Sequence, residues 1–281
     1  MVKGGRFFAS REKRPVAAVY RGKVACDGCA ESVAHLLRKS PMRYKVHYLG
    51  PDEDHDINAS TLSHLDIFAW PGGGDDENTD YLKVENYTKD IQDYVSNGGR
   101  YAGFCLGAFF ARGPENNQTF FGLLPEGSYT SGERFQPGAQ TSSANDTIIL
   151  TDWTFGSGPK KGQTIKDRWQ YFQDGGQFYI DKSVKDAKIL GRYVYTNDPS
   201  AVIVPYGQGS VGLIGFHPEA DQSWYDDYNI VNPQNISVSM SDDDKGSWIY
   251  ADTSSLNSMN LVTTFYVPFT NHKAQVSLMQ A

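Results

Sequence analysis

Gly103-Phe104-Cys105-Leu106-Gly107 is the stretch that decides how this sequence folds. An apolar, strand-like run leads into it, and a short helix-like run, AFFA, follows. A cysteine between two glycines at a strand-to-helix turn is the cysteine counterpart of the G-x-S-x-G nucleophile elbow. The glycines relieve crowding at the turn, and a helix start stabilises a thiolate. The pattern predicts Cys105 as a nucleophile, with a buried structural cysteine as the alternative.

The sequence before this turn alternates between strand and helix signals. Apolar, β-rich runs occupy residues 15–20 and 65–70, and residues 43–50 alternate like a strand. Helical periodicity marks residues 29–40 and 87–99. Gly98 stands where the cap of the second helix is expected. Such alternation predicts an α/β fold with a mainly parallel central sheet and helices on both faces.

The second half of the chain predicts added antiparallel strands. Strand-like runs cover residues 146–153, 167–180 and 187–195, separated by Gly, Asn and Pro turns. Val202–Val204 and Val211–Phe216 flank a Gly207–Gly209 turn and form a predicted β-hairpin. No repeat or linker interrupts the chain, so we expect one domain over residues 1–281. Its core spans about residues 15–220, and residues 221–281 form a C-terminal extension.

Composition excludes two classes of partner. The 281 residues are 39% hydrophobic and 21% charged, as in an ordinary globular protein. The formal net charge of −7 argues against binding to nucleic acid, which favours a basic surface, and against anionic membrane surfaces. No apolar run approaches the ~20 residues that span a bilayer. We therefore expect no nucleic-acid or membrane partner.

A second motif, Gly215-Phe216-His217-Pro218-Glu219, follows another apolar strand-like run. A histidine at a strand end lies where doubly wound folds place their sites. The glutamate two residues further on can accept the Nδ1–H of His217, which leaves Nε2 free to take a thiol proton. A surface His-Pro turn is the alternative when the motif stands alone.

Together, GFCLG and GFHPE closely resemble the G-x-C-x-G and H-P-E signatures of class I glutamine amidotransferases. The resemblance covers residues 15–219 in element order. It implies a flavodoxin-like three-layer α/β fold with a Cys105–His217–Glu219 triad. The PGGGD, GFCLGAFFA and YFQDGGQFY segments look most like the biotin-protein-ligase N-terminal-domain-like group, which includes single-domain fungal members. The catalytic domain of the ligase is absent from this sequence, so biotin transfer is not implied.

The glycine loop Pro71–Asp75 ends the third predicted strand. In the amidotransferase-like superfamily this turn lies beside the elbow and offers N–H groups to an oxyanion. Gly72 and Gly73, together with the Leu106 N–H after the nucleophile, are therefore the candidate oxyanion hole. A plain turn is the alternative, and the following DDENTD is expected to be a solvated loop. This chemistry requires no metal and no organic cofactor.

The remaining cysteines, Cys26 and Cys29, lie between a predicted strand and helix. A disulfide is the favoured interpretation, and a reduced or redox-active pair is the alternative. The chain also holds more N-x-S/T sequons than chance predicts, at Asn58, Asn86, Asn117, Asn145 and Asn235. Both features favour a secreted glycoprotein. Residues 1–15 contain no apolar core of a signal peptide, so a cytoplasmic location is the alternative.

Three functions fit these observations. The first is a cysteine hydrolase that cleaves an amide or ester in a small molecule or peptide. The second is a glutaminase subunit that serves a separate synthetase. The third is a non-catalytic binding or regulatory module on the same fold. Phe109 stands where class I amidotransferases commonly have the glutamine that helps to bind substrate, which disfavours glutamine as the substrate. No protein partner is identified by the sequence.

Overall fold

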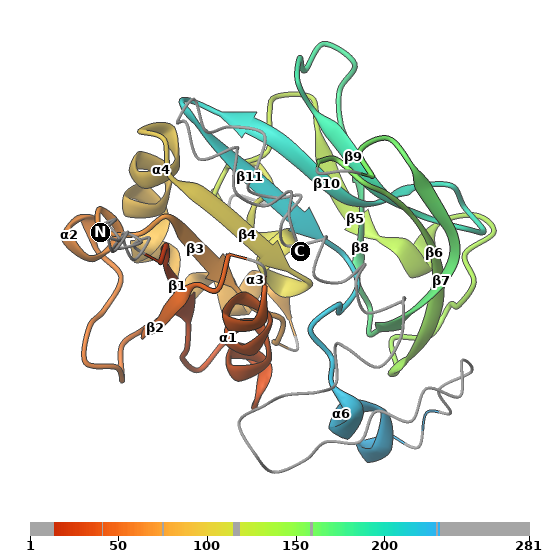
Figure 1. Cartoon of the computed structure of the whole chain (residues 1–281), viewed down its shortest axis with the longest axis horizontal. Coiled ribbons are helices and arrows are strands. Elements are labelled where there is room, and N and C mark those ends of the chain that lie inside the picture. The colour runs from red at the N-terminus through yellow and green to blue at the C-terminus, as the bar shows by residue number, and fades with distance from the viewer. Residues whose placement is uncertain are drawn as a thin grey trace, which may run out of the picture.

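The computed structural model describes residues 14–40, 42–74, 76–114, 119–157, 160–228 and 230. Within this part of the chain, a nine-stranded sheet runs in the order β2-β1-β3-β4-β11-β10-β9-β6-β7. The neighbours from β2 to β11 pair in parallel, and those from β11 to β7 pair antiparallel. Figure 1 shows these two halves at opposite ends of the sheet. The expected α/β fold, with its added antiparallel strands, is confirmed.

The parallel half contains β1 (Val16–Tyr20), β2 (Lys45–Leu49), β3 (Ile67–Trp70), β4 (Arg100–Phe104) and β11 (Gly209–Ile214). The antiparallel half contains β10 (Pro199–Tyr206), β9 (Lys188–Tyr193), β6 (Thr147–Thr154) and β7 (Thr164–Phe172). The predicted hairpin is β10–β11, and its second strand also pairs with β4. One strand therefore joins the two halves.

Helices cover both faces of the parallel half. They are α1 (Cys29–Lys39), α2 (Ala59–Leu62), α3 (Glu77–Leu82), α4 (Thr88–Ser96) and α5 (Leu106–Phe110), with a 3₁₀ turn η1 (Glu85–Tyr87) before α4. Alternate residues of β1 enter different cores: Ala17 packs in the cluster that contains α1, and Ala18 packs in the cluster that contains α4 and α5. Burial on both faces explains why β1 and β3 are continuously apolar.

Two sequence expectations need correction. Residues 76–80, expected to be part of a solvated loop, begin α3 instead, because the Asp76 carboxylate accepts hydrogen bonds from the N–H groups of Asn78 and Thr79. Residues 167–180 do not form one strand: a turn at Gln173–Gly175 ends β7 and starts β8 (Gly176–Tyr179). Asp174 has a φ of 45°, which a continuous strand does not allow.

The strand β8 pairs with β5 (Tyr129–Gly132) in a separate two-stranded ribbon, which the sequence analysis missed. A 3₁₀ turn, η2 (Glu133–Phe135), follows β5. The Glu133 N–H donates to Gly175 O at 2.9 Å, so η2 holds the turn that ends β7.

The C-terminal extension is described only in part. It contains α6 (Gln222–Asp227), and residues 231–281 lie outside the described chain. None of the helices in the described residues has the length and apolarity that a bilayer crossing requires.

Glu133 is a fully buried carboxylate between η2 and the β9–β10 turn. Its Oε1 accepts a hydrogen bond from the Thr196 hydroxyl at 2.8 Å, whereas Oε2 has no hydrogen-bond partner among the described residues. Burial raises the pKa of Glu133 to about 7, against the smaller lowering effect of Thr196. The folded protein therefore holds this proton to a higher pH than the unfolded chain does.

We predict that Glu133→Gln stabilises the protein at pH 8 relative to wild type, but not at pH 4. A raised folded-state pKa gives a stabilisation that is fully present below the unfolded pKa and is lost as the pH rises through about 7. At pH 8, the neutral amide should raise the free energy of unfolding by up to about 3 kcal/mol relative to wild type. Chemical denaturation at both pH values measures it, with exposed Glu85→Gln as the matched control. If Glu133→Gln changed the free energy of unfolding equally at pH 4 and pH 8, the raised pKa of Glu133 would be contradicted.

Candidate active site

Cys105 lies at the turn between β4 and α5, where the sequence placed it. Its φ of 47° and ψ of −109° are strained for a residue with a side chain, as a nucleophile elbow requires. The Cys105 N–H donates to Ile214 O at 2.9 Å, which fixes the elbow to the end of β11. Figure 1 shows β4 and β11 side by side, with their carboxyl ends together.

The two glycines of the pentapeptide are required by close packing. A Cβ at Gly103 would stand 2.4 Å from Gly107 O, and one at Gly107 would stand 2.3 Å from Trp70 O. Neither backbone neighbour can move without separating α5 from β3 and β4. The G-x-C-x-G spacing therefore follows from the close contact between the turn and the sheet.

The Cys105 side chain is partly exposed and lies near the turn that ends β7. Its Sγ lies 3.7 Å from Gln173 O. The same turn is held by the Arg134–Asp174 ion pair and by the Glu133 N–H. The antiparallel half of the sheet thus supplies one wall beside the sulfur.

His217 follows β11 at the same end of the sheet, and only 3% of its surface is exposed to solvent. Its N–H donates to Tyr171 O at 2.9 Å, so an isolated bridge to β7 fixes its backbone. Its Nδ1 lies 2.8 Å from Oε1 of Glu219, which is fully buried. The carboxylate orients the ring as the sequence predicted.

Electrostatics favour a protonated imidazole. Burial alone would lower the pKa of His217, but the Glu219 carboxylate and the Cys105 sulfur raise it to about 10. The Nε2 of His217 makes no hydrogen bond of ordinary geometry within the described chain. Catalytic hydrogen bonds are often long in proteins without substrate.

Gly72 borders both side chains. A Cβ at this position would stand 2.7 Å from His217 Cε1 and 3.4 Å from Cys105 Cβ. Cysteine, histidine and glycine thus surround one small space at the ends of β3, β4 and β11. The structure brings together five of the six residues predicted for catalysis and the oxyanion hole, and Gly73 lies one residue further along the same loop.

The glycine loop is held from two sides. Gly107 N–H donates to Pro71 O at 3.2 Å, and Cys26 N–H donates to Gly72 O at 3.3 Å. Within the described residues, the N–H groups of Gly72, Gly73 and Leu106 donate to no backbone carbonyl. These are the three N–H groups that the sequence analysis assigned to the oxyanion hole.

Aromatic side chains cover His217. The Trp224 ring centroid, from α6, lies 5.1 Å from that of His217, and the Tyr171 centroid lies 6.0 Å from it. Trp224 and Tyr171 also pack edge to face at 5.3 Å. They shield the His217–Glu219 pair from water and so strengthen its electrostatic interaction.

The sequence analysis identified neither Trp224 nor Tyr171 as part of the site. The signal that distinguishes Tyr171 is its position two residues before Gln173, at the end of the strand that bridges to His217. Trp224 reaches His217 because of where α6 lies, and no sequence motif around Trp224 signals this contact.

Phe109 is buried in α5 and faces the ribbon. A Cβ at Gly176 would stand 3.2 Å from Phe109 Cζ, so the phenyl ring lies against the first residue of β8. This ring fills space beside the Gln173–Gly175 turn. It brings no hydrogen-bonding group there.

The other predicted sites lie apart from Cys105. Cys26 and Cys29 lie at the distance of a disulfide pair, with Cα atoms 5.3 Å apart. Asn58, Asn86 and Asn145 are exposed, whereas Asn117 and Asn235 lie outside the described residues. The Asn58 side chain caps α2 by accepting from Thr61 N–H.

Across the described residues, no group of three or more His, Cys, Asp or Glu side chains is arranged to hold a metal ion.

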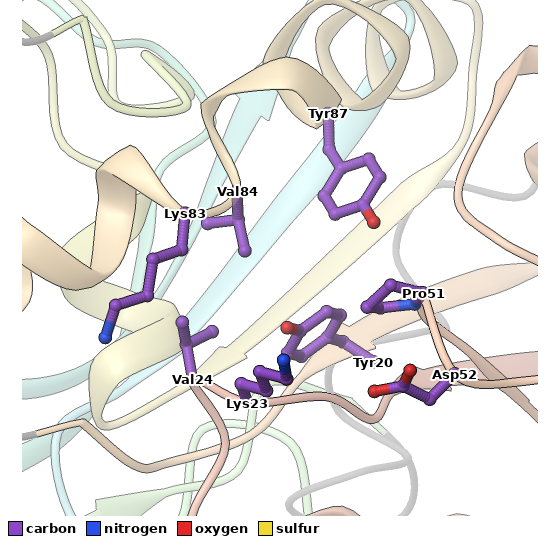
Figure 2. A pocket seen from close by; sticks show the side chains of 8 residues that line it. All are labelled: Tyr20, Lys23, Val24, Pro51, Asp52, Lys83, Val84 and Tyr87. Atoms are coloured by element: carbon purple, nitrogen blue, oxygen red, sulfur yellow. The ribbon is translucent and has the colours of Figure 1, made fainter.

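A pocket of about 190 Å³ opens at the carboxyl ends of β1 and β2 (Figure 2). None of the residues around Cys105 lines it. Its walls are Tyr20, Lys23, Val24, Pro51, Asp52, Lys83, Val84 and Tyr87. The pocket therefore does not mark the proposed site of chemistry.

Comparison with known proteins supports the resemblance seen in the motifs. Residues 17–116 match the family model of the biotin-protein ligase N-terminal region. The biotin–protein ligase of Schizosaccharomyces pombe is 29% identical over 185 aligned residues, which cover 58% of this chain and 28% of the ligase. The chain thus spans less than a third of the length of that relative.

Solved structures share the fold. A glutamine amidotransferase from Thermotoga maritima gives a TM-score of 0.52 at 12% identity, covering 90% of this chain and 97% of the other. PurLQS from Thermotoga maritima gives 0.50 at 18% identity, covering 74% and 89%. A ThuA-like protein from Bacteroides uniformis gives 0.52 at 11% identity, covering 94% of each chain. The predicted resemblance to the amidotransferase-like and biotin-protein-ligase N-terminal groups is confirmed, and at these identities the structures show the fold alone.

We predict that Gly72→Ala disables His217 without unfolding the protein. Gly72 has no positive φ, so its backbone accepts alanine, but the new methyl group would stand 2.7 Å from His217 Cε1. Displacing the ring should slow alkylation of Cys105 at pH 6 by about tenfold or more. Gly113→Ala is the control, because a Cβ there meets nothing within 4 Å. Equal alkylation rates in both variants would contradict the described packing.

Proposed function

We propose that this chain, whose fold is that of glutamine amidotransferases and whose first half resembles the N-terminal region of biotin-protein ligases, is a cysteine-dependent hydrolase of amide or ester bonds. The observation that carries the proposal is the buried His217–Glu219 pair beside an elbow cysteine. We place the catalytic domain at about residues 15–220, within a single domain of 281 residues.

The first half-reaction uses the resting ion pair. The Cys105 thiolate attacks the carbonyl carbon, and the carbonyl electron pair moves to oxygen. The N–H groups of Gly72, Gly73 and Leu106 stabilise the oxyanion. Collapse of this intermediate expels the amine or alcohol, which takes the proton from His217 Nε2. A thioester on Cys105 remains.

The second half-reaction restores the enzyme. Neutral His217 now accepts a proton from water, and the resulting hydroxide attacks the thioester. Collapse releases a carboxylic acid and returns the thiolate beside a protonated imidazole. Glu219 keeps Nδ1 protonated and the ring oriented throughout. The raised pKa of His217 suits the first step, in which the ring must arrive protonated at neutral pH.

The region around the nucleophile favours an acyl group of low polarity. Phe109 packs against Gly176 beside the site, and Trp224 and Tyr171 cover the histidine. The Gln173–Gly175 turn, with the Arg134–Asp174 pair, provides the polar part of the wall. A small molecule or short peptide with one apolar face would fit these surroundings.

Two other functions stay in competition with hydrolysis. A glutaminase subunit would need a separate synthetase and a polar contact in place of Phe109. A binding or regulatory module would keep the elbow without turnover. Secretion and glycosylation at the exposed sequons remain predictions of the sequence.

Cys105 should be the reactive thiol of the native protein. Iodoacetamide at pH 6 is expected to alkylate Cys105 and to leave the bonded Cys26 and Cys29 unmodified. His217→Ala should slow the reaction at least about tenfold, because the cation that stabilises the thiolate is lost. His64→Ala, at an exposed position, serves as the control. Peptide mass spectrometry gives the rates, and an unchanged rate in His217→Ala would remove the basis for the triad.

Glutamine should not be the substrate. A buried amide left unpaired against Phe109 costs about 1–3 kcal/mol, or roughly ten- to a hundredfold in affinity. Purified protein should release no more ammonia from millimolar glutamine than Cys105→Ala does, with or without candidate synthetases. Phe109→Leu, which keeps an apolar side chain, should behave like wild type. Robust ammonia release that depends on Cys105 would instead favour the glutaminase function.

A further inference from the structure

The Cys26–Cys29 disulfide lies at the edge of the candidate active site. Cys26 is exposed, whereas Cys29 is fully buried as the first residue of the eleven-residue helix α1. Gly28 between them has a φ of 78°, which lets the chain turn back sharply, and Cys29 N–H donates to Cys26 O at 3.1 Å. One sulfur-bearing residue is thus open to solvent, and the other is held inside the fold.

The segment that contains Cys26 contacts the glycine loop directly. Cys26 N–H donates to Gly72 O at 3.3 Å. A Cβ at Gly73 would stand 2.3 Å from Cys26 N, 2.6 Å from Val24 O and 2.7 Å from Ala25 C. Three consecutive residues of the cysteine segment therefore pack on a residue whose N–H is available to the oxyanion.

The two restraints on the glycine loop differ in kind. The contact of Gly107 N–H with Pro71 O belongs to the elbow and is set by the packing of α5 on β3. The contact of Cys26 N–H with Gly72 O comes from residues 24–26, in which Val24 is buried and Cys26 is exposed, and the disulfide ties this segment to α1. The pocket of Figure 2 adjoins this segment, because Lys23 and Val24 line it. Beside the segment there is therefore unfilled space into which it can move.

We propose that Cys26–Cys29 is a redox site for dithiols, and that its oxidation state controls the acylation of Cys105 through Gly72 and Gly73. The inference rests on the proposed function and adds its regulation. In the oxidised protein the disulfide holds the segment against the glycine loop. Reduction releases the segment, and the Gly73 N–H loses its fixed direction toward the oxyanion.

The exchange reaction balances with a dithiol as the reductant. One thiolate of the reagent attacks the sulfur of exposed Cys26 and forms a mixed disulfide, and Cys29 leaves as a thiolate at the start of α1. The partial positive charge of the helix N-terminus stabilises this leaving group. The second thiol of the reagent then displaces Cys26. Two electrons pass to the protein, and the reagent leaves as a cyclic disulfide.

Two reactions of Cys105 separate control of the oxyanion from loss of the nucleophile. Acylation by p-nitrophenyl acetate passes through a tetrahedral oxyanion, which needs the glycine loop. Alkylation by iodoacetamide displaces iodide at a saturated carbon and forms no oxyanion, so it reports the thiolate and His217 alone. Reduction should slow acylation about tenfold and leave alkylation unchanged, since loss of one oxyanion donor costs about 10²–10³ in rate and a loosened donor costs less.

The test uses the full chain in three forms. These are the oxidised protein, protein reduced with dithiothreitol and freed of reagent by gel filtration, and a Cys26→Ser, Cys29→Ser variant that cannot form the bond. Differential alkylation and mass spectrometry verify the state of the pair in each form. Reoxidation of the reduced protein should restore the acylation rate, which distinguishes a switch from damage.

Slower acylation with unchanged alkylation, in both the reduced protein and the double variant, supports the proposal. Equal acylation rates in all three forms would overturn it, and so would a pair that excess dithiothreitol does not reduce. A parallel fall in both reactions would also overturn it, because general loosening of the site would then be the cause. An oxidised protein in which Cys105 reacts with neither reagent contradicts the proposed function itself.

Discussion

The positions of Cys105 and His217 depend on one close contact between backbone segments, where α5 meets β3 and β4. Gly107 stands against the carbonyl of Trp70, and Gly103 stands against the carbonyl of Gly107, each too close for a side chain. This packing leaves Cys105 at a φ of 47°, and the cost of about 1–3 kcal/mol must come from the surrounding fold. Cys105 N–H adds the bond to Ile214 O that places the end of β11, and hence His217, beside the sulfur. The site is thus a consequence of how one turn packs.

The sequence predicted the parts of the fold that local chemistry determines. In the parallel half, β1 and β3 are apolar runs and β2 alternates between polar and apolar residues. The helix α1 carries Val33, Leu36 and Leu37 on its buried face. The elbow and the His217–Glu219 pair were found because they combine residue type with fixed spacing. The α3 helix was missed because its Asp76 cap lies in an acidic run that also suits a loop. Neither apolar periodicity nor a turn motif marked it.

The rest of the site could not be predicted from the sequence, because it depends on contacts between residues that lie far apart in the chain. Trp224 reaches His217 only through the position of α6, and the Gln173–Gly175 turn reaches Cys105 only because β7 pairs with the far end of the antiparallel half. The run 167–180 looks like one strand, since nothing local reveals that Gly175 must pass within contact of Gly215 O. The fold and the sharp turn at Cys105 could therefore be predicted, whereas the residues around that turn could not.

This division has a consequence for specificity. The parallel half supplies Cys105, the glycine loop and, through β11, His217, and each of these is fixed by backbone packing that admits little variation. The antiparallel half and its ribbon supply Gln173, Asp174 and the surface that faces Phe109, through side chains and a turn that can change without moving the sheet. Two proteins can therefore share the elbow and the histidine pair while accepting different acyl groups. Phe109 itself lies on α5 in the parallel half, so its contact with Gly176 of β8 is a point where the two halves meet beside Cys105.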